Sequence, residues 1–373
     1  MNKSNKTIES FKGHVWKQGR FTYSEFYIKD DKIGRGIKSR PYDAAYIIPP
    51  FTDPHIHGGW GYDFEKDEFG PLEDKLKQLG VFCAIPTISC SSLEKLKKIS
   101  AWFEKYKSKT SQSIFPFLRV EGPFINPEKK GIQDNKNILF PSIKNLEEWL
   151  SIDHFKMFTF APEIKKSDVF VEKSLYEQKI PSVGHSQATF KEFSRLYRLG
   201  LRHMTHYPNA MSTLHHREIG LTGAGLLLDD LQLEVIADGI HTSLDFFQLL
   251  LKIKGPTFCI TSDMVPAAHS KQRKFPNIRI DKTGRQITTK DQILAGGATS
   301  VPEQAKILFE LGIKPEKIVP LACLNSLKFF NLPLPKIKPG EDADFVVLNQ
   351  SFEVEAVYEK GHIISGVENW KTD

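Results

Sequence analysis

The sequence predicts an α/β protein in which a closed parallel (β/α)8 barrel, or TIM barrel, carries a small β-sandwich domain formed by both ends of the chain. The chain has 373 residues and 40% of them are hydrophobic, which is enough for such a barrel and a satellite domain. Short apolar runs alternate with helix-like segments through the middle of the chain, and strand-like segments occupy its two ends.

The two ends have the pattern of short strands joined by turns. The turns near the beginning are rich in Lys, Asp and Gly, and a Pro-Gly-Glu-Asp turn begins at Pro339. The strand candidates are residues 14–16, 21–28, 45–48, 345–348, 354–358 and 362–364. We therefore expect residues 1–48 and 336–373 to form one small β-domain, and residues 49–335 to form the barrel.

Eight apolar runs in the middle of the chain predict the barrel strands. They are residues 49–56, 81–87, 114–120, 157–161, 180–183, 203–205, 233–237 and 257–261. Several segments between them begin with a hydroxyl residue that precedes an acid by three positions, which is typical of a helix N-terminus. These pairs are Ser91 with Glu94, Thr189 with Glu192, Thr242 with Asp245, and Ser300 with Glu303.

Composition argues against several classes of partner. The net charge is +6, but the lysines are scattered and form no basic stripe, so we expect no nucleic-acid partner. The positive charge is compatible with an anionic substrate. No apolar run is long enough for a signal peptide or a membrane span. We therefore expect no membrane partner. The four cysteines form no C-x-x-C pair, so we expect reduced thiols in a cytoplasmic protein; they are Cys83, Cys90, Cys259 and Cys323.

Residue types that bind metals recur directly after the predicted strands. In a (β/α)8 barrel the carboxyl ends of all strands meet at one rim, where the chemistry takes place. His55 and His57 are two positions apart on an extended segment, so both imidazoles point to the same side. The further candidates at strand ends are Glu121, His185, His206, Asp238, His241 and Asp263. Any one of them could be a helix cap or a satisfied buried residue, but their recurrence at one rim predicts a metal site.

The donor types indicate the chemistry of that site. Imidazole and carboxylate ligands suit zinc, and iron, manganese, cobalt and nickel accept the same donors. Such an ion lowers the pKa of its bound water from about 15.7 to about 7 and polarises a carbonyl. An aspartate beside it can take the proton of the water and return it to a leaving nitrogen. We therefore expect a hydrolase that cleaves an amide and holds one or two divalent ions per subunit.

Nearly the whole chain resembles the N-acetylglucosamine-6-phosphate deacetylases of the amidohydrolase superfamily. The matching stretches are PPFTDPHIHGGWGYDF from Pro49, RVEGPFINPEKKG from Arg119, VGHSQAT from Val183, THYPNAM from Thr205, REIGLTGAGL from Arg217, ADGIHTS from Ala237, TSDMVPAA from Thr261, LAGGATS from Leu294 and PGEDADFVVLN from Pro339. VEGPF followed by KKG is specific because most other amidohydrolases lack a metal-binding Glu there. The fourth strand ends without a lysine, which argues against the types that use a carboxylated lysine.

The resemblance implies roles for individual residues. The implied metal ligands are Glu121, His185 and His206 for a principal ion and His55 and His57 for a second one. Asp263 would be the general base and then the general acid. The implied substrate-binding residues are Ile132, Gln133, Asn209, Ala210, Arg217, His241, Leu294, Ala295 and Gly296. In the family the arginine at position 217 contacts phosphate and is often lent by the neighbouring subunit, which implies a homodimer.

Three positions on the substrate side depart from the pattern of the family. Gln133 stands where the family has a histidine that touches the sugar, Pro208 where it has an aromatic residue, and Ile219 where it has a proline. Glutamine donates and accepts hydrogen bonds but carries no charge. The predicted reaction is the conversion of N-acetylglucosamine 6-phosphate to glucosamine 6-phosphate and acetate. N-acetylgalactosamine 6-phosphate or another amino sugar isomer stays open as the substrate.

Two further hypotheses stay open on the sequence alone. A different amidohydrolase activity, such as deacylation of an amino acid or deamination of a ring, would use the same metal ligands but would not depend on Arg217. A non-catalytic relative that keeps the barrel for assembly or sensing would have lost metal ligands, whereas this sequence retains every candidate ligand and the acid.

Overall fold

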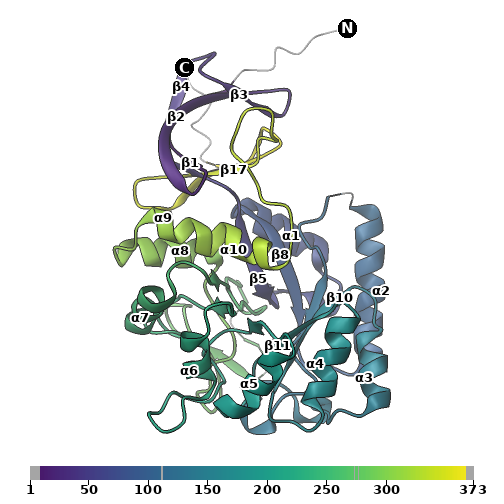
Figure 1. The fold of residues 1–373 in the computed structure, drawn as a ribbon. Coiled ribbons are helices and arrows are strands. Elements are labelled where there is room, and N and C mark those ends of the chain that lie inside the picture. Colours follow the sequence, from purple (N-terminus) through teal and green to yellow (C-terminus); the bar gives the residue numbers. More distant parts are fainter. Residues whose placement is uncertain (1–8, 111, 273, 276, 367–373) are drawn as a thin grey trace.

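The structure is a computed structural model that describes residues 9–110, 112–272, 274–275 and 277–366. The predicted small domain extends at both ends into residues 1–8 and 367–373, which lie outside the described residues. Figure 1 shows two parts, a large α/β body and a smaller sheet that lies beyond α8, α9 and α10.

Eight parallel strands form the barrel, in the same order in the sheet as along the chain. They are β5 (Phe51–Ile56), β8 (Val81–Ile88), β9 (Leu118–Val120), β10 (Phe155–Phe160), β11 (Ile180–Val183), β12 (His203–Met204), β13 (Gln232–Val235) and β14 (Cys259–Ile260). The two outer strands of this order meet, because Ile56 forms a parallel bridge with Met264 and the Asp263 N–H donates to the His55 carbonyl at 2.9 Å. The predicted barrel is therefore confirmed.

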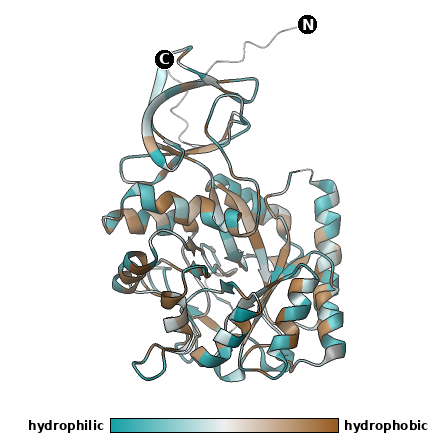
Figure 2. Cartoon of the chain, viewed as in Figure 1, coloured by the Kyte–Doolittle hydropathy of each residue, from teal (hydrophilic) through white to brown (hydrophobic). Residues whose placement is uncertain are grey.

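Helices follow the strands and cover the barrel (Figure 1). They are α1 (Phe69–Gln78), α2 (Leu93–Lys109), α3 (Ile143–Leu150), α4 (Ser167–Tyr176), α5 (Phe190–Arg198), α6 (Gly220–Leu227), α7 (Leu244–Lys254) and α8 (Val301–Glu310), with α9 (Pro315–Val319) and α10 (Asn325–Phe329) after them. Apolar and polar residues alternate around these helices, as expected for helices with one face on a core (Figure 2). Among the described residues, none of the helices combines the length and apolarity needed to span a membrane.

The predicted helix starts are correct for two helices and one residue early for two others. Thr189 and Ser300 form reciprocal capping boxes with Glu192 and Glu303. At α2 and α7 the capping hydroxyl belongs to the next residue, because Ser92 and Ser243 accept the N–H groups of Lys95 and Phe246. In each case two hydroxyl residues are adjacent in the sequence, so the pattern alone does not distinguish them.

Strands from both ends of the chain form the small domain, as predicted. They are β1 (Ser10–Lys17), β2 (Arg20–Lys29), β3 (Lys32–Arg35), β4 (Pro41–Ile48), β17 (Phe345–Leu348), β18 (Val354–Glu359) and β19 (His362–Gly366). They are hydrogen-bonded into one sheet in the order β19-β18-β17-β4-β1-β2-β3. This sheet curls around its own core, because Phe345 on β17 and Phe26 on β2 are three strands apart in the order yet their ring centroids are 5.3 Å apart.

The two faces of this sheet pack into different hydrophobic cores. Alternate side chains of a strand point to opposite faces. Val15 and Val347 belong to the core of the small domain, whereas Trp16 and Val346 pack into the core of the barrel. The strand β4 ends at Ile48, the last residue before the predicted start of the barrel.

Candidate metal centre

Three predicted ligands from three different strands converge at the rim of the barrel. Glu121 follows β9, His185 follows β11 and His206 follows β12. The Glu121 Oε1 atom is 3.1 Å from His185 Nε2 and 2.8 Å from His206 Nε2, and the two Nε2 atoms are 3.1 Å apart. A triangle with these sides has a circumradius of about 1.7 Å, so points about 2.1 Å from all three donors exist.

A second group lies beside the first. The Nε2 atoms of His55 and His57, at the end of β5, are 3.1 Å apart. Asp263 Oδ1 lies 3.2 Å from His55 Nε2 and 3.4 Å from His57 Nε2. Glu121 Oε2 is 3.4 Å from His57 Nε2, so the two oxygens of this carboxylate face different groups. Glu121 is therefore placed to be shared between two ions.

Hydrogen bonds fix the orientation of the first group. His185 Nδ1 is 2.8 Å from the carbonyl oxygen of Lys129. Because a carbonyl only accepts, Nδ1 must carry a proton, which leaves Nε2 as the nitrogen that offers a lone pair when the imidazole is neutral. That lone pair points at the space shared with Glu121 and His206, which is the arrangement found in metal sites.

The charge states at neutral pH also suit a cation. Burial opposes ionisation of Glu121, but the charge on His185 and hydrogen bonds from His185 and His206 hold its pKa well below the usual range. Burial likewise opposes ionisation of Asp263, but His55 and His57 lower its pKa to about 2. Burial and the charge of Arg119 lower the pKa of His55 to about 4.

His57 behaves differently from His55. Burial alone would lower its pKa, but hydrogen bonds to Asp263 and Glu121 raise the pKa to about 10. The proton on His57 thus occupies the place between two carboxylates that a divalent ion would take. Binding of an ion there would release this proton, because only the neutral imidazole is a ligand.

Three of these residues have a left-handed backbone, which side chains rarely adopt. The φ angle is 49° at His185, 32° at His206 and 49° at Asp263. Such conformations cost of order 1–3 kcal/mol each and cluster at functional sites. Aspartate and histidine are among the side chains that adopt this conformation most often, but both residue types occur in many other conformations and did not predict it here.

Comparison with known proteins agrees with this geometry. The sequence model described as "Amidohydrolase family" matches residues 178–364. The crystal structure of N-acetylglucosamine-6-phosphate deacetylase from Thermotoga maritima covers 96% of this chain and 99% of its own length, with 31% sequence identity and a TM-score of 0.86.

The chain belongs to the amidohydrolase family. Its predicted resemblance to the N-acetylglucosamine-6-phosphate deacetylases is confirmed. The deacetylase of that name from Bacillus subtilis is 27% identical over 90% of this chain and 91% of its own length. N-acetylgalactosamine-6-phosphate deacetylase from Escherichia coli O157:H7 is also 27% identical, over 94% of this chain and 99% of its own.

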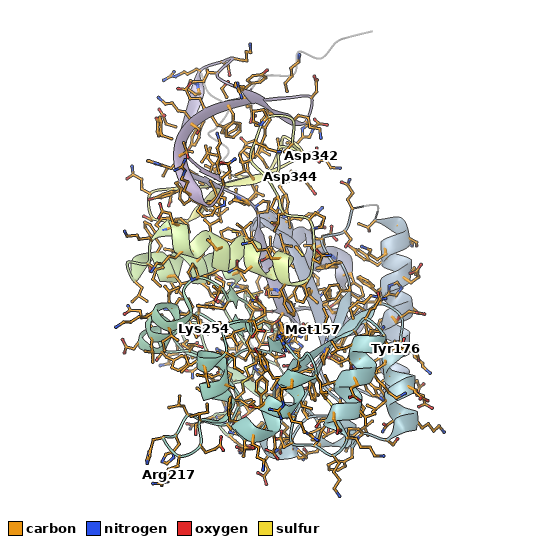
Figure 3. All side chains as sticks on the ribbon, viewed as in Figure 1. Met157, Tyr176, Arg217, Lys254, Asp342 and Asp344 are labelled. Carbon is orange, nitrogen blue, oxygen red and sulfur yellow. The ribbon has the colours of Figure 1, made fainter. Side chains whose placement is uncertain are left out.

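The predicted phosphate contacts of this amidohydrolase lie in different environments. His241 Nδ1 is 2.8 Å from Asp238 Oδ2. Burial would lower the pKa of His241, but the bond to Asp238 and its charge raise it. Its Nε2 atom is buried and has no hydrogen-bond partner among the described residues. Arg217 is exposed at the tip of a loop that projects from the barrel, so its own subunit does not bring it to the ligands (Figure 3).

The other predicted substrate residues lie in three segments of the chain. Asn209 and Ala210 lie three and four positions after His206, and the Asn209 N–H donates to the His206 carbonyl at 2.8 Å. Gln133 is buried against Glu121, whereas the Ile132 side chain beside it is 43% exposed. Leu294, Ala295 and Gly296 precede α8.

Close backbone packing explains the glycines that follow Ala295. A Cβ at Gly296, whose φ is 84°, would lie 2.4 Å from a methyl carbon of Val265. A Cβ at Gly297 would lie 2.0 Å from the carbonyl oxygen of Ser262. The Gly297 N–H donates to the Asp263 carbonyl at 2.7 Å, so this segment supports the backbone that carries the candidate acid.

A buried ion pair beneath the ligands was not predicted. Arg119 on β9 and Glu234 on β13 are fully buried, and Arg119 Nη1 is 2.6 Å from Glu234 Oε1. Glu234 Oε2 lies 3.5 Å from His55 Nδ1, and Glu234 Oε1 lies 3.3 Å from His203 Nε2. The sequence contained a hint, since each charged residue interrupts an apolar strand.

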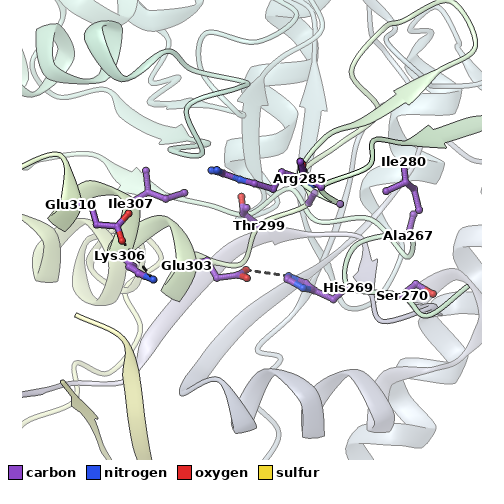
Figure 4. A pocket seen from close by; sticks show the side chains of 13 residues that line it. Ala267, His269, Ser270, Ile280, Arg285, Thr299, Glu303, Lys306, Ile307 and Glu310 are labelled. Carbon is purple, nitrogen blue, oxygen red and sulfur yellow. Dashed lines mark hydrogen bonds and ion pairs between the residues drawn. The ribbon is translucent and has the colours of Figure 1, made fainter. Parts of the chain in front are cut away.

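A cavity of about 530 Å³ lies apart from the ligands, against α8 and the hairpin of β15 (Ile278–Ile280) and β16 (Ile287–Thr289). Figure 4 shows His269 paired with Glu303 in it, with Arg285 and Thr299 nearby. Its lining contains none of the metal-ligand candidates, so we do not assign the chemistry to it.

Proposed function

We propose that this amidohydrolase hydrolyses the N-acetyl group of N-acetylglucosamine 6-phosphate, giving glucosamine 6-phosphate and acetate. The observation that carries the proposal is the convergence of Glu121, His185 and His206 on one point with Asp263 beside them. The Thermotoga maritima and Bacillus subtilis relatives bear this activity in their names.

The proposed ligands are Glu121, His185 and His206 for a principal ion, for which zinc is the best fit, and His55 and His57 for a second ion. When bound, the metal supplies an activated hydroxide and polarises the acyl carbonyl. Asp263 is ionised at neutral pH, so its carboxylate can accept a proton from the nucleophile and return it to the leaving nitrogen.

The substrate side of the proposal involves a second subunit. Asn209, Ala210 and the segment from Leu294 to Gly296 would border the sugar, and His241 would meet the phosphate. Because its loop projects into solvent (Figure 3), Arg217 would reach the phosphate bound by a neighbouring subunit. The protein would then be a homodimer. We place this metabolic activity in the cytoplasm.

N-acetylgalactosamine 6-phosphate is the second candidate substrate. The Escherichia coli relative that bears this activity in its name covers nearly the whole chain at the same identity as the Bacillus subtilis deacetylase. The changes at Gln133 and Pro208 from the pattern of the family leave the metal ligands themselves intact. Acetate release from the two epimers at equal concentration, compared as kcat/KM, decides between them.

Removal of metal is expected to abolish acetate release from N-acetylglucosamine 6-phosphate. Protein dialysed against a chelator would be assayed before and after addition of one and two equivalents of zinc, with metal content measured in parallel. Recovery at one equivalent indicates that a single ion suffices, and recovery only at two indicates a binuclear centre. Metal-loaded protein that hydrolyses no N-acetyl amino sugar phosphate contradicts the proposed function.

Replacement of Arg217 by alanine is expected to raise KM about 10- to 100-fold for the phosphorylated sugar, since a hydrogen bond to a charged group contributes about 1.5–3 kcal/mol. Hydrolysis of unphosphorylated N-acetylglucosamine should be unchanged. Arg198→Ala, an exposed change on α5, is the matched control. An equal effect of Arg217→Ala on both sugars would favour a different amidohydrolase activity.

A further inference from the structure

The loop of residues 126–133 contacts two of the three principal ligands. It supplies the Lys129 carbonyl that fixes the His185 imidazole. It also carries Gln133, whose side chain is buried and only 3% exposed, between Glu121 and the backbone of Cys90. The loop is itself anchored to the barrel, because the Asn126 N–H donates to the His185 carbonyl at 2.9 Å.

The orientation of the Gln133 amide follows from its partners. The Cys90 N–H lies 2.7 Å from Oε1 of Gln133, and a backbone N–H can only donate. Oε1 must therefore face Cys90, which leaves Nε2 to face Glu121. Nε2 donates to Glu121 Oε2 at 2.6 Å, a charge-assisted hydrogen bond to an ionised acceptor.

The hydrogen bond from Gln133 restricts the terminal torsion of Glu121, whose rotation would otherwise move Oε1 away from the two histidines. The terminal torsion of a glutamate is broad, so an unrestrained carboxylate can rotate about it. With Oε2 held by Gln133, Oε1 stays 3.1 Å from His185 Nε2 and 2.8 Å from His206 Nε2. The amide does this without adding positive charge to a site that must attract a cation, which a protonated histidine at this position would do.

We propose that Gln133 is a positioning residue for the metal centre, which sets the affinity of the Glu121–His185–His206 group by holding the Glu121 carboxylate. The proposal rests on the proposed function only in that this group binds a divalent metal. At the position where the resembled family has a sugar-contacting histidine, the side chain acts through Glu121, since Oε1 and one Nε2 hydrogen are already engaged.

The substitution Gln133→Met removes the donor that faces Glu121 and keeps a side chain of similar length without introducing a charge. We expect the dissociation constant for zinc, measured by competition with a chelator, to rise about 10- to 100-fold. The melting temperature of the metal-free protein, measured in parallel, reports the separate loss of packing and of the hydrogen bond to Cys90. Gln133→Leu serves as a second variant without the donor if the methionine protein does not fold.

Lys130→Met is the matched control in the same loop. Its Nζ donates to the Gln133 carbonyl at 3.1 Å, so this change perturbs the loop without altering the Gln133 amide. Wild-type zinc affinity is expected for this variant. Wild-type affinity in Gln133→Met, or equal weakening in both variants, would overturn the proposal.

The result also separates this inference from the proposed function. Wild-type protein that binds zinc in a Gln133-dependent way but hydrolyses no N-acetyl amino sugar phosphate would leave the positioning role intact and refute the substrate. Normal turnover with a metal affinity that does not depend on Gln133 would support the proposed substrate and refute the positioning role of Gln133. Wild-type protein without affinity for a divalent metal would refute both.

Discussion

Replacing Asp263 by asparagine is expected to lower kcat for acetate release about 10²- to 10⁴-fold, the usual contribution of a general acid–base group. Asparagine has nearly the same shape but cannot accept the proton of the nucleophile. Because the pKa of Asp263 is lowered to about 2, the carboxylate is available as a base throughout the neutral range. Steady-state kinetics with metal-loaded protein measure the effect.

Metal content must be measured in the same preparations, since Asp263 Oδ1 lies within 3.4 Å of both histidines of the second group. A loss of rate with full metal content supports the acid–base role, whereas a loss restored by excess zinc indicates a ligand role only. Asp168→Asn, on the exposed side of α4, is the control and should leave kcat unchanged. A wild-type rate in Asp263→Asn would refute the assignment of the acid.

Replacing Arg119 by methionine is expected to destabilise the fold by about 3–5 kcal/mol, because it leaves the Glu234 charge buried without its partner. Urea denaturation followed by circular dichroism measures the change in unfolding free energy. The double variant with Glu234→Met removes both charges and should recover most of the loss. A smaller loss in the single variant than in the double variant would contradict this account.

The control for this prediction is an ion pair at the surface. Lys173 Nζ on α4 and Glu147 Oε1 on α3 are 2.8 Å apart at the surface of the protein. Lys173→Met should change stability by less than about 1 kcal/mol, because water screens exposed pairs. The contrast tests whether burial, rather than the number of ion pairs, determines the contribution.

Much of the fold was predictable because the spacing of apolar residues along the sequence reflects which residues are buried. Most residues of the barrel strands are buried and apolar, and the predicted runs at residues 81–87 and 180–183 nearly coincide with β8 and β11. The four-residue strand β3 was missed, since a hairpin strand that short gives little periodic pattern. All four cysteines are free, in agreement with the predicted thiols.

The proximity of the candidate ligands was also predictable, because the carboxyl ends of all strands in a (β/α)8 barrel lie at the same rim. The orientation of the ligands was not predictable in the same way. The contact of His185 with the Lys129 carbonyl depends on a backbone atom, and the path of Arg119 to Glu234 crosses the barrel interior. The direction of Gln133 depends on Cys90, which is distant in sequence. Such contacts appear only after the chain has folded.

The pairing of β17 with β4 has a consequence for biosynthesis. Val346 and Ile48 are partners in this ladder, although nearly the whole barrel separates them along the chain. The ribosome therefore synthesises β1 to β4 long before β17. Until the barrel has formed, Trp16 and Ile48 on one face of these strands have no core to pack against, and the other face lacks Phe345. Nascent chains that stop short of β17 should retain the N-terminal hairpin as an exposed apolar surface and become clients of chaperones.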